Sequence, residues 1–297
     1  MFDTPDIHGY RILSELGQGG VAVVYEAEVH GTAKDSTDGT PAIVALKTLK
    51  PEALAQQNVV ASFQYETRVL SRLDHPGILR LFDTGAQDGV AFAAVELVDG
   101  EPLDSFLIRR GKLKQAEAID FGIQVLDALD HLHERGYVHR DIKHGNLMLT
   151  KNHRLVLMDF GTVVKAGTKI DYEVGLYGTV PFLSPEQIEQ RPNIDGRADL
   201  YATGVLLYRM VAGVRPFQGT REDVLDAHLH LEPKRPSRYA HISPEFDAFI
   251  LKSLAKSPED RHASAAEMLA ELREIEKAGD PPKASLGERL FGWLRPG

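Results

Sequence analysis

The sequence predicts an α+β protein in which a small β-rich lobe precedes a larger, mainly helical lobe. The first third of the chain contains short β-branched or alternating runs, separated by glycine and polar turns, as in antiparallel strands. After residue 100, apolar residues recur every three or four positions, which is typical of amphipathic helices. Asp99-Gly100 ends the last of these runs, so we place the lobes at residues 10–99 and 100–276.

The first lobe is expected to hold five strands and one helix. The strands are predicted at Tyr10–Leu16, Val21–Val29, Ile43–Leu49, Ile78–Phe82 and Val90–Val98. Pro51 opens the helical pattern, because the apolar side chains that follow share one face of a helix. His75-Pro76-Gly77 then ends that helix.

The second lobe is expected to begin with a helix through Ile119, Ile123, Leu126 and Leu129 that runs to Gly136. A short strand follows at Leu155–Met158, and further helices are predicted at Ala198–Val211, Asp223–Leu231, Pro244–Ala255 and Ala263–Ile275. Residues 277–297 are interpreted as a linker and a short amphipathic tail with Phe291 and Trp293 on its apolar face. Two interpretations of this tail stay open. It either docks on a surface, which would be the helical lobe, a partner or a membrane face, or it is a frayed terminus.

Composition excludes several classes of function. The chain has 297 residues, of which 43% are hydrophobic, as in ordinary globular proteins. Its net charge is −9, so it lacks the broad basic field of a nucleic-acid-binding protein, and we expect no nucleic-acid partner. The absence of cysteine excludes disulfides, thiolate zinc sites and cysteine nucleophiles. No apolar run approaches the ~20 residues of a membrane span, and the N-terminus does not resemble a signal peptide.

A glycine-rich turn lies between the first two predicted strands, in Leu16-Gly17-Gln18-Gly19-Gly20. Glycines there would let the backbone N–H groups approach phosphates, although a simple hairpin turn also favours glycine. A strand, rather than a helix, follows this turn. That order argues against a dinucleotide-binding fold and against a Walker-type loop, both of which place phosphate at a helix N-terminus.

Lys47 is the one charged residue in the apolar strand Val44-Ala45-Leu46-Lys47. It either extends to water from a strand edge or points into a cleft, where a carboxylate would hold it. Glu66 is the expected carboxylate, since it lies on the helix face that also carries Phe63 and Leu70.

The most specific motif is His139-Arg140-Asp141-Ile142-Lys143-His144-Gly145-Asn146, followed by Asp159-Phe160-Gly161. This set can supply a carboxylate that orients a hydroxyl (Asp141) and a cation for a γ-phosphate (Lys143). It also offers oxygen ligands for magnesium from Asn146 and Asp159, which suit a metal that binds few protein oxygens together with substrate phosphates. The probability that this spacing occurs by chance after the glycine turn and Lys47 is very small.

The order of glycine turn, VALK, HRDIKHGN, DFG and SPE resembles the signature set of protein kinases. The match is closest to the bacterial Hanks-type serine/threonine kinases and covers about residues 10–275. It is supported by further stretches in the second half: Gly178-Thr179, Ser184-Pro185-Glu186, Asp199-Leu200-Tyr201, Arg215-Pro216-Phe217 and Pro258-Glu259-Asp260-Arg261. The resemblance implies the two-lobed protein-kinase fold.

The resemblance also implies a nucleotide site. Adenine would lie between Leu16, Val24, Ala45 and Met148, with hydrogen bonds from the backbone at Glu96 and Val98 and with Val95 as the gatekeeper. Residues Gly17, Gln18, Gly19 and Gly20 would cover the phosphates, and Lys47, paired with Glu66, would contact them. Asp141 and Lys143 would act at the reacting hydroxyl and phosphoryl group, and Asn146 and Asp159 would hold Mg²⁺ or Mn²⁺.

Structural roles are implied in the same way. Leu70, Leu81, His139 and Phe160 would stack between the lobes, anchored on Asp199, and Glu186 would form a buried pair with Arg261. His144 replaces the usual proline, and we expect it to be a solvated loop histidine. Thr168 is the best candidate for autophosphorylation, with Arg140 or Lys165 as its partner. Alternatively, Asp171 or Glu173 could already offer Arg140 a carboxylate.

The sequence therefore predicts a protein serine/threonine kinase that uses ATP and magnesium on protein substrates, including itself, which would involve self-association. We expect it in the cytoplasm, either free or as the cytoplasmic part of a longer membrane-anchored protein. A pseudokinase scaffold is the alternative. It would lack one of Lys47, Asp141, Asn146 and Asp159, whereas all four are present. A small-molecule phosphotransferase, the third hypothesis, would lack the SPE segment and the region around Arg261.

Overall fold

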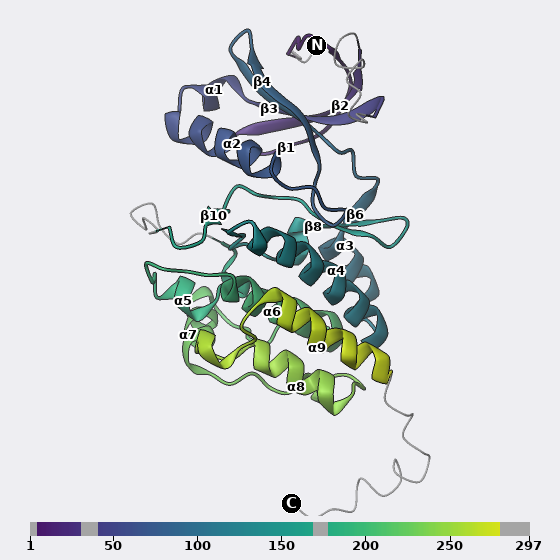
Figure 1. The fold of residues 1–297 in the computed structure, drawn as a ribbon, viewed down its shortest axis with the longest axis vertical. Coiled ribbons are helices and arrows are strands. Elements are labelled where there is room, and N and C mark those ends of the chain that lie inside the picture. The colour runs from purple at the N-terminus through teal and green to yellow at the C-terminus, as the bar shows by residue number, and fades with distance from the viewer. Residues whose placement is uncertain (1–4, 31–40, 169–177, 280–297) are drawn as a thin grey trace, which may run out of the picture.

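The computed structural model describes residues 5–30, 41–168 and 178–279. Figure 1 shows a β-sheet and one long helix at the N-terminal end of the molecule and a set of helices at the other. A continuous hydrophobic core joins the two parts, because side chains from the sheet and from the helices belong to one buried cluster. The α+β, two-lobed architecture predicted from the sequence is confirmed.

The first lobe is built on a five-stranded antiparallel sheet in the order β1-β2-β3-β5-β4. The strands span Tyr10–Gln18 (β1), Ala22–Val29 (β2), Ile43–Leu49 (β3), Leu81–Gln87 (β4) and Val90–Val95 (β5). The fourth strand was predicted too early, at 78–82. Ile78 and Leu79 are buried and pair with Leu157 of the second lobe instead, so they join the two lobes rather than starting β4.

The helical pattern that begins at Pro51 forms two helices rather than one. They are α1 (Pro51–Leu54) and α2 (Gln57–Leu70). Gln56 has φ −100° and ψ 98°, an extended conformation that interrupts the run. Helix α2 buries Phe63, Glu66 and Leu70, and thus presents a carboxylate on its core-facing side.

The second lobe contains α3 (Leu103–Arg110), α4 (Gln115–Glu134), α5 (Pro185–Ile188), α6 (Arg197–Ala212), α7 (Arg221–His230), α8 (Pro244–Ser253) and α9 (Ala265–Ala278). Helix α6 lies in the middle of this lobe and is buried along nearly its whole length. Short strands β6 (Gly100–Pro102), β8 (Leu147–Thr150) and β9 (Leu155–Leu157) form one small sheet, and β7 (Tyr137–Val138) pairs with β10 (Val164–Lys165). Helices α3 and α5 and the short strands β6, β7, β8 and β10 were not predicted from the sequence.

The two lobes meet at a stack of buried side chains around His139. The rings of His139 and Phe160 are 5.2 Å apart in an edge-to-face arrangement, and both are fully buried with Leu70 nearby in the same core. Asp199 accepts hydrogen bonds from the backbone amides of His139 and Arg140 at 2.8 and 2.7 Å. These bonds hold Arg140 at φ +69°, a conformation that costs free energy for a non-glycine residue.

A buried ion pair braces the base of the helical lobe. Arg261 donates to both carboxylate oxygens of Glu186 at 2.8 Å, and the side chains are 0% and 5% exposed. No helix among the described residues is both long enough and apolar enough to cross a bilayer. The tail predicted around Phe291 and Trp293 lies outside the described residues.

Candidate active site

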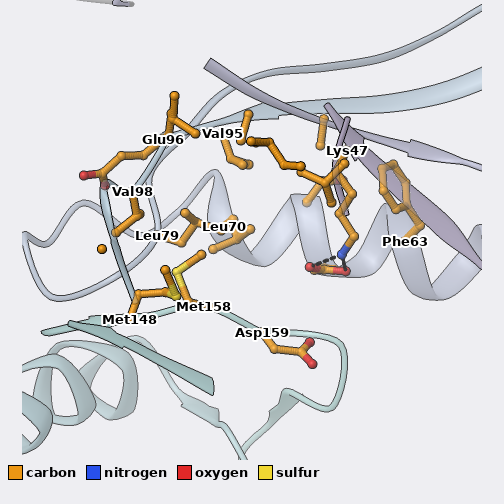
Figure 2. A pocket seen from close by; sticks show the side chains of 18 residues that line it. Lys47, Phe63, Leu70, Leu79, Val95, Glu96, Val98, Met148, Met158 and Asp159 are labelled. Atoms are coloured by element: carbon orange, nitrogen blue, oxygen red, sulfur yellow. Dashed lines mark hydrogen bonds and ion pairs between the residues drawn. The ribbon is translucent and has the colours of Figure 1, made fainter. Parts of the chain in front are cut away.

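A cavity of about 520 Å³ lies between the lobes, and side chains from both lobes line it (Figure 2). Ten of the residues expected at the nucleotide and metal site are on its wall: Leu16, Val24, Ala45, Lys47, Glu66, Val95, Glu96, Val98, Met148 and Asp159. The sequence analysis placed Phe63 and Leu70 on the helix face of Glu66 without assigning them to the site, and both line the wall. It missed other wall residues, among them Thr67 of α2, Leu79, Ala93 and Met158. The position of Thr67, four residues after Phe63 on α2, was an available signal for one of these.

Strand alternation explains why Lys47 faces the cavity. Ala45 and Lys47 are two positions apart on β3, so their side chains share one face of the sheet. Val44 and Leu46 point to the other face and enter a separate core cluster with Tyr25. The strand therefore supplies one apolar wall residue and one cation to the same cavity.

Lys47 and Glu66 form the charged pair inside this cavity (Figure 2). Lys47 Nζ donates to Glu66 Oε1 at 2.8 Å and to Oε2 at 2.9 Å, and it lies 5.7 Å from the centre of the Phe63 ring. The Glu66 side chain is 11% exposed and that of Lys47 is 29% exposed. Lys47 is thus held on the wall of the cavity by Glu66, rather than extending from a strand edge into water.

The glycine turn joins β1 to β2 above the cavity. Gly19 N donates to Ala22 O at 2.8 Å, which closes the turn. A Cβ added at Gly17 or Gly20 would meet nothing within 4 Å, so packing does not require glycine at these two positions. Without side chains, Gly17, Gly19 and Gly20 leave the backbone of this turn accessible, while Gln18 ends β1.

Asp141 lies in the loop that follows β7 and is held by three neighbours. Its Oδ2 accepts hydrogen bonds from Lys143 Nζ at 2.6 Å and Asn146 Nδ2 at 3.0 Å, and its Oδ1 accepts one from the Thr179 amide at 2.8 Å. Burial alone would raise the pKa of Asp141. The hydrogen bonds and the charge of Lys143, with the other two contacts, hold this pKa below its usual value. The carboxylate is therefore ionised at neutral pH and fixed in orientation.

Thr179 reaches Asp141 because Gly178 precedes it. Gly178 has φ +107°, and a Cβ there would lie 2.7 Å from Leu183 and 3.1 Å from the carbonyl oxygen of Arg140. Only glycine tolerates both the conformation and the close approach. Lys143 Nζ then donates to Thr179 Oγ1 at 2.7 Å, so one ammonium group bridges Asp141 and Thr179.

Asn146 and Asp159 offer oxygen atoms that fit a hard divalent cation. Asn146 Nδ2 donates to Asp141, which leaves the amide oxygen of Asn146 as an acceptor. Asp159 Oδ1 accepts a hydrogen bond from Gly161 N at 3.0 Å. Asp159 also lies on the cavity wall (Figure 2). One carboxylate and one amide oxygen suit Mg²⁺ or Mn²⁺, which complete their coordination with phosphate oxygens and water.

His144 corrects an expectation from the sequence. It was expected to be solvated, but it is only 3% exposed. Its Nε2 lies 3.3 Å from the carbonyl oxygen of Leu206 on α6, and its ring is 5.3 Å from that of Phe182, edge to face. Burial lowers the pKa of His144 to about 3, so the ring is neutral and Nε2 donates to the carbonyl. The side chain ties the loop of Asp141 and Lys143 to the central helix.

The segment after Asp159-Phe160-Gly161 packs against the same loop. Arg140 Nε donates to the carbonyl oxygen of Thr162 at 2.7 Å, and the Thr162 hydroxyl donates to His139 O at 2.9 Å. Thr168 is exposed and its amide donates to Lys165 O. The acidic alternatives Asp171 and Glu173 lie outside the described residues.

An apolar cavity between a β-sheet lobe and a helical lobe, with a lysine–glutamate pair on its wall and an aspartate–lysine–asparagine loop in the helical lobe, is typical of the protein-kinase fold. The chain belongs to the protein kinase domain family, which matches residues 10–272.

The chain is similar to curated bacterial serine/threonine-protein kinases. It is 36% identical to a probable serine/threonine-protein kinase of Streptomyces coelicolor over 272 residues, which cover 89% of this chain and 39% of the relative. It is 35% identical to the serine/threonine-protein kinase pkn3 of Myxococcus xanthus, covering 90% of this chain and 50% of the relative. It is 32% identical to the serine/threonine-protein kinase PknB of Mycolicibacterium smegmatis, covering 92% of this chain and 44% of the relative. The chain thus spans half or less of the length of these relatives.

Proposed function

We propose that this chain transfers the γ-phosphoryl group of ATP to serine and threonine hydroxyls of protein substrates. The observation that carries the proposal is the bridge that Lys143 makes between Asp141 and Thr179 beside the cavity. It places an oriented carboxylate and a cation at one point, which is what a hydroxyl attacking a phosphoryl group requires.

The cavity supplies the nucleotide site of the proposal. Leu16, Val24, Ala45 and Met148 would enclose the adenine, since all four line the cavity and are apolar. The Glu96 carboxylate pairs with Arg154 on the outside, and Figure 2 shows this side chain turned away from the cavity. The backbone at Glu96 and Val98 is the part that would bind the base.

Charge neutralisation would come from residues on the cavity wall and from the loop that carries Asp141. Lys47, kept in place by Glu66, would contact the α- and β-phosphates, and the backbone of the glycine turn would cover them. Asn146 and Asp159 would hold Mg²⁺, which when bound supplies positive charge to the phosphate oxygens. Lys143 would neutralise the phosphoryl group in transfer, so catalysis would come mainly from positioning and electrostatic stabilisation.

Asp141 would receive a hydrogen bond from the acceptor hydroxyl and orient it toward the phosphorus atom. Because its pKa is held low, this carboxylate acts mainly by orientation rather than as a strong base. The Lys143–Thr179 contact, together with the names of the relatives, favours serine and threonine over tyrosine as the acceptor.

A radiolabel assay with ATP and magnesium tests the proposal against its alternatives. Transfer to a generic protein substrate supports a protein kinase, and transfer only to small molecules would point to a small-molecule phosphotransferase. Absence of transfer to any acceptor, with nucleotide binding retained, would favour the pseudokinase scaffold. Self-association during autophosphorylation, the cytoplasmic location and contact of the tail with a membrane stay predictions.

A further inference from the structure

A second cavity, of about 400 Å³, lies in the helical lobe where α6 ends and α7 begins. Its wall consists of Arg209 from α6, residues 213–215 and 217–219 of the following loop and Val224 of α7. Arg209 and Arg215 are the charged residues on this wall. We call this cavity the arginine pocket.

The arginine pocket adjoins the loop that carries Asp141 and Lys143. His144 Nε2 contacts the carbonyl oxygen of Leu206, and Arg209 follows Leu206 by one helical turn on α6. On the other side, α7 packs against Val180–Phe182, the turn that follows Thr179, and Phe182 contacts the His144 ring. An extended peptide with its hydroxyl at Asp141 would therefore pass close to the pocket.

Arg209 and Arg215 line the same cavity, and both have guanidinium N–H groups that could bind an anion. Arg215 is exposed and makes no hydrogen bond or ion pair with any residue of the described ranges. Arg209 uses one nitrogen, Nη1, to donate to the carbonyl oxygen of Gly111 at 2.8 Å. Burial lowers the pKa of Arg209, the nearby carboxylate of Asp104 raises it, and the charge of Arg215 lowers it further. Arg209 and Arg215 thus place two like charges on the wall of one cavity.

This local positive charge contrasts with the net charge of the whole chain, which is −9. Both guanidinium groups also contribute to the low pKa of the His144 ring, after burial as the main cause. An anionic group that binds beside two like charges reduces the repulsion between them. Guanidinium groups bind carboxylates and phosphates in bidentate geometry.

We propose that the arginine pocket binds an acidic side chain of the protein substrate, an aspartate, glutamate or phosphorylated residue near the acceptor serine or threonine. The inference rests on the proposed function and specifies its substrate class. It makes Arg215 a specificity-determining residue and Arg209 its partner, with no part in the phosphoryl transfer itself.

Peptide binding tests the pocket independently of catalysis. Fluorescence anisotropy would compare labelled serine peptides that differ only in carrying Glu, phosphoserine, Gln or Lys at successive positions on either side of the serine. At the best position we expect the acidic peptides to bind about tenfold more tightly than the Gln peptide. Arg215→Gln should remove this difference and Arg215→Glu should shift the preference to Lys. Equal binding of all four peptides by the wild-type protein, or an acidic preference that survives Arg215→Glu, overturns the inference.

The matched control is Arg273→Gln, which removes an exposed arginine of α9 that lines neither cavity. This variant should keep the acidic preference. Inorganic phosphate, added as a competitor, separates recognition of a peptide from binding of a free anion. If phosphate binds to the pocket and no peptide discriminates, the pocket is a free-anion site and the inference is wrong.

Kinetics then separate this inference from the proposed function. With the acidic peptide, Arg215→Gln should raise KM by about tenfold and leave kcat unchanged, because the pocket contacts bound substrate equally in ground and transition states. Equal KM and kcat for acidic and neutral peptides contradict the inference while leaving the kinase activity standing. An acidic binding preference without any phosphoryl transfer supports the pocket and removes the proposed function.

Discussion

Asp141 and Thr179 are joined directly, because Asp141 Oδ1 accepts a hydrogen bond from the Thr179 amide at 2.8 Å. The contact links the loop after β7 to the segment that leads into α5, and Gly178 makes the approach sterically feasible. Lys143 reinforces it by binding both residues. The proposed acceptor site is therefore assembled from two parts of the chain that are distant in sequence.

Replacing Lys47 with Met should reduce phosphoryl transfer by about 10²–10³-fold, because its ammonium group neutralises phosphate charge rather than packing the core. Steady-state kinetics with ATP and magnesium measure the loss, and circular dichroism checks that the fold is kept. Because the variant leaves Glu66 without its partner, Lys47→Met/Glu66→Gln is the matched control and should be equally inactive. Turnover near that of the wild type would show that the role assigned to Lys47 is wrong.

Replacing Arg261 with Met should lower the free energy of unfolding by about 3–5 kcal/mol, because the Glu186 carboxylate would stay buried without a partner. Urea denaturation measures this change. Arg110→Met is the control, since Arg110 and its partner Glu117 are partly exposed and the pair contributes less than about 1 kcal/mol. Equal effects of the two substitutions would contradict the bracing role of the buried pair.

The buried His144 ring should make stability fall on acidification. The pKa of His144 is about 3 in the folded protein, against roughly 6.5 for an exposed histidine. Between these values the unfolded chain binds a proton that the folded chain excludes. The neutral His144 ring therefore contributes fully to the free energy of unfolding above about pH 6.5. As the pH falls from there toward 3, this free energy decreases by about 1.4 kcal/mol per pH unit. Urea denaturation at several pH values would show a smaller slope for His144→Gln, which keeps a donor for Leu206 O. Identical slopes would mean that the ring titrates normally.

Thr168 is the expected site of activating autophosphorylation. A phosphate there would bring about −1.5 to −2 charges near Arg140 and Lys165 and could form charge-assisted hydrogen bonds with them. Thr168→Ala should then lower activity strongly, and Asp171→Ala/Glu173→Ala should leave it unchanged. The reverse pattern, full activity of Thr168→Ala and loss in the double variant, would assign the role to a built-in carboxylate.

The sequence predicted the strands of the first lobe, apart from the bounds of β4, and the longer helices, because their apolar periodicity is set by which face is buried. Helix α3 was not predicted, because it has only eight residues. Its buried Leu103, Phe106 and Leu107 are too few to establish a period. The break at Gln56 and the late start of β4 depend on contacts between distant segments, such as the pairing of Ile78 with Leu157. Local propensity carries no information on such contacts.

The candidate site could be predicted where a motif fixes residue type and spacing, as for Lys47, Asp141, Lys143, Asn146 and Asp159. The burial of His144 could not be predicted in this way, because it depends on α6 and on Phe182, which are far away in sequence. The arginine pocket was missed for the same reason. Arg209 and Arg215 belong to a helix end and a loop, and only the fold shows that both line one cavity.

Mapping of phosphorylation sites by mass spectrometry, after incubation with ATP and magnesium, tests the central claim most directly. The proposed function predicts phosphate on serine or threonine residues of this chain or of an added protein substrate. It also predicts almost complete loss of these sites in Asp141→Asn, which removes the charge that orients the acceptor while keeping the size of the side chain. Absence of phosphorylated residues with the wild-type protein, or an equal pattern in Asp141→Asn, would contradict the account.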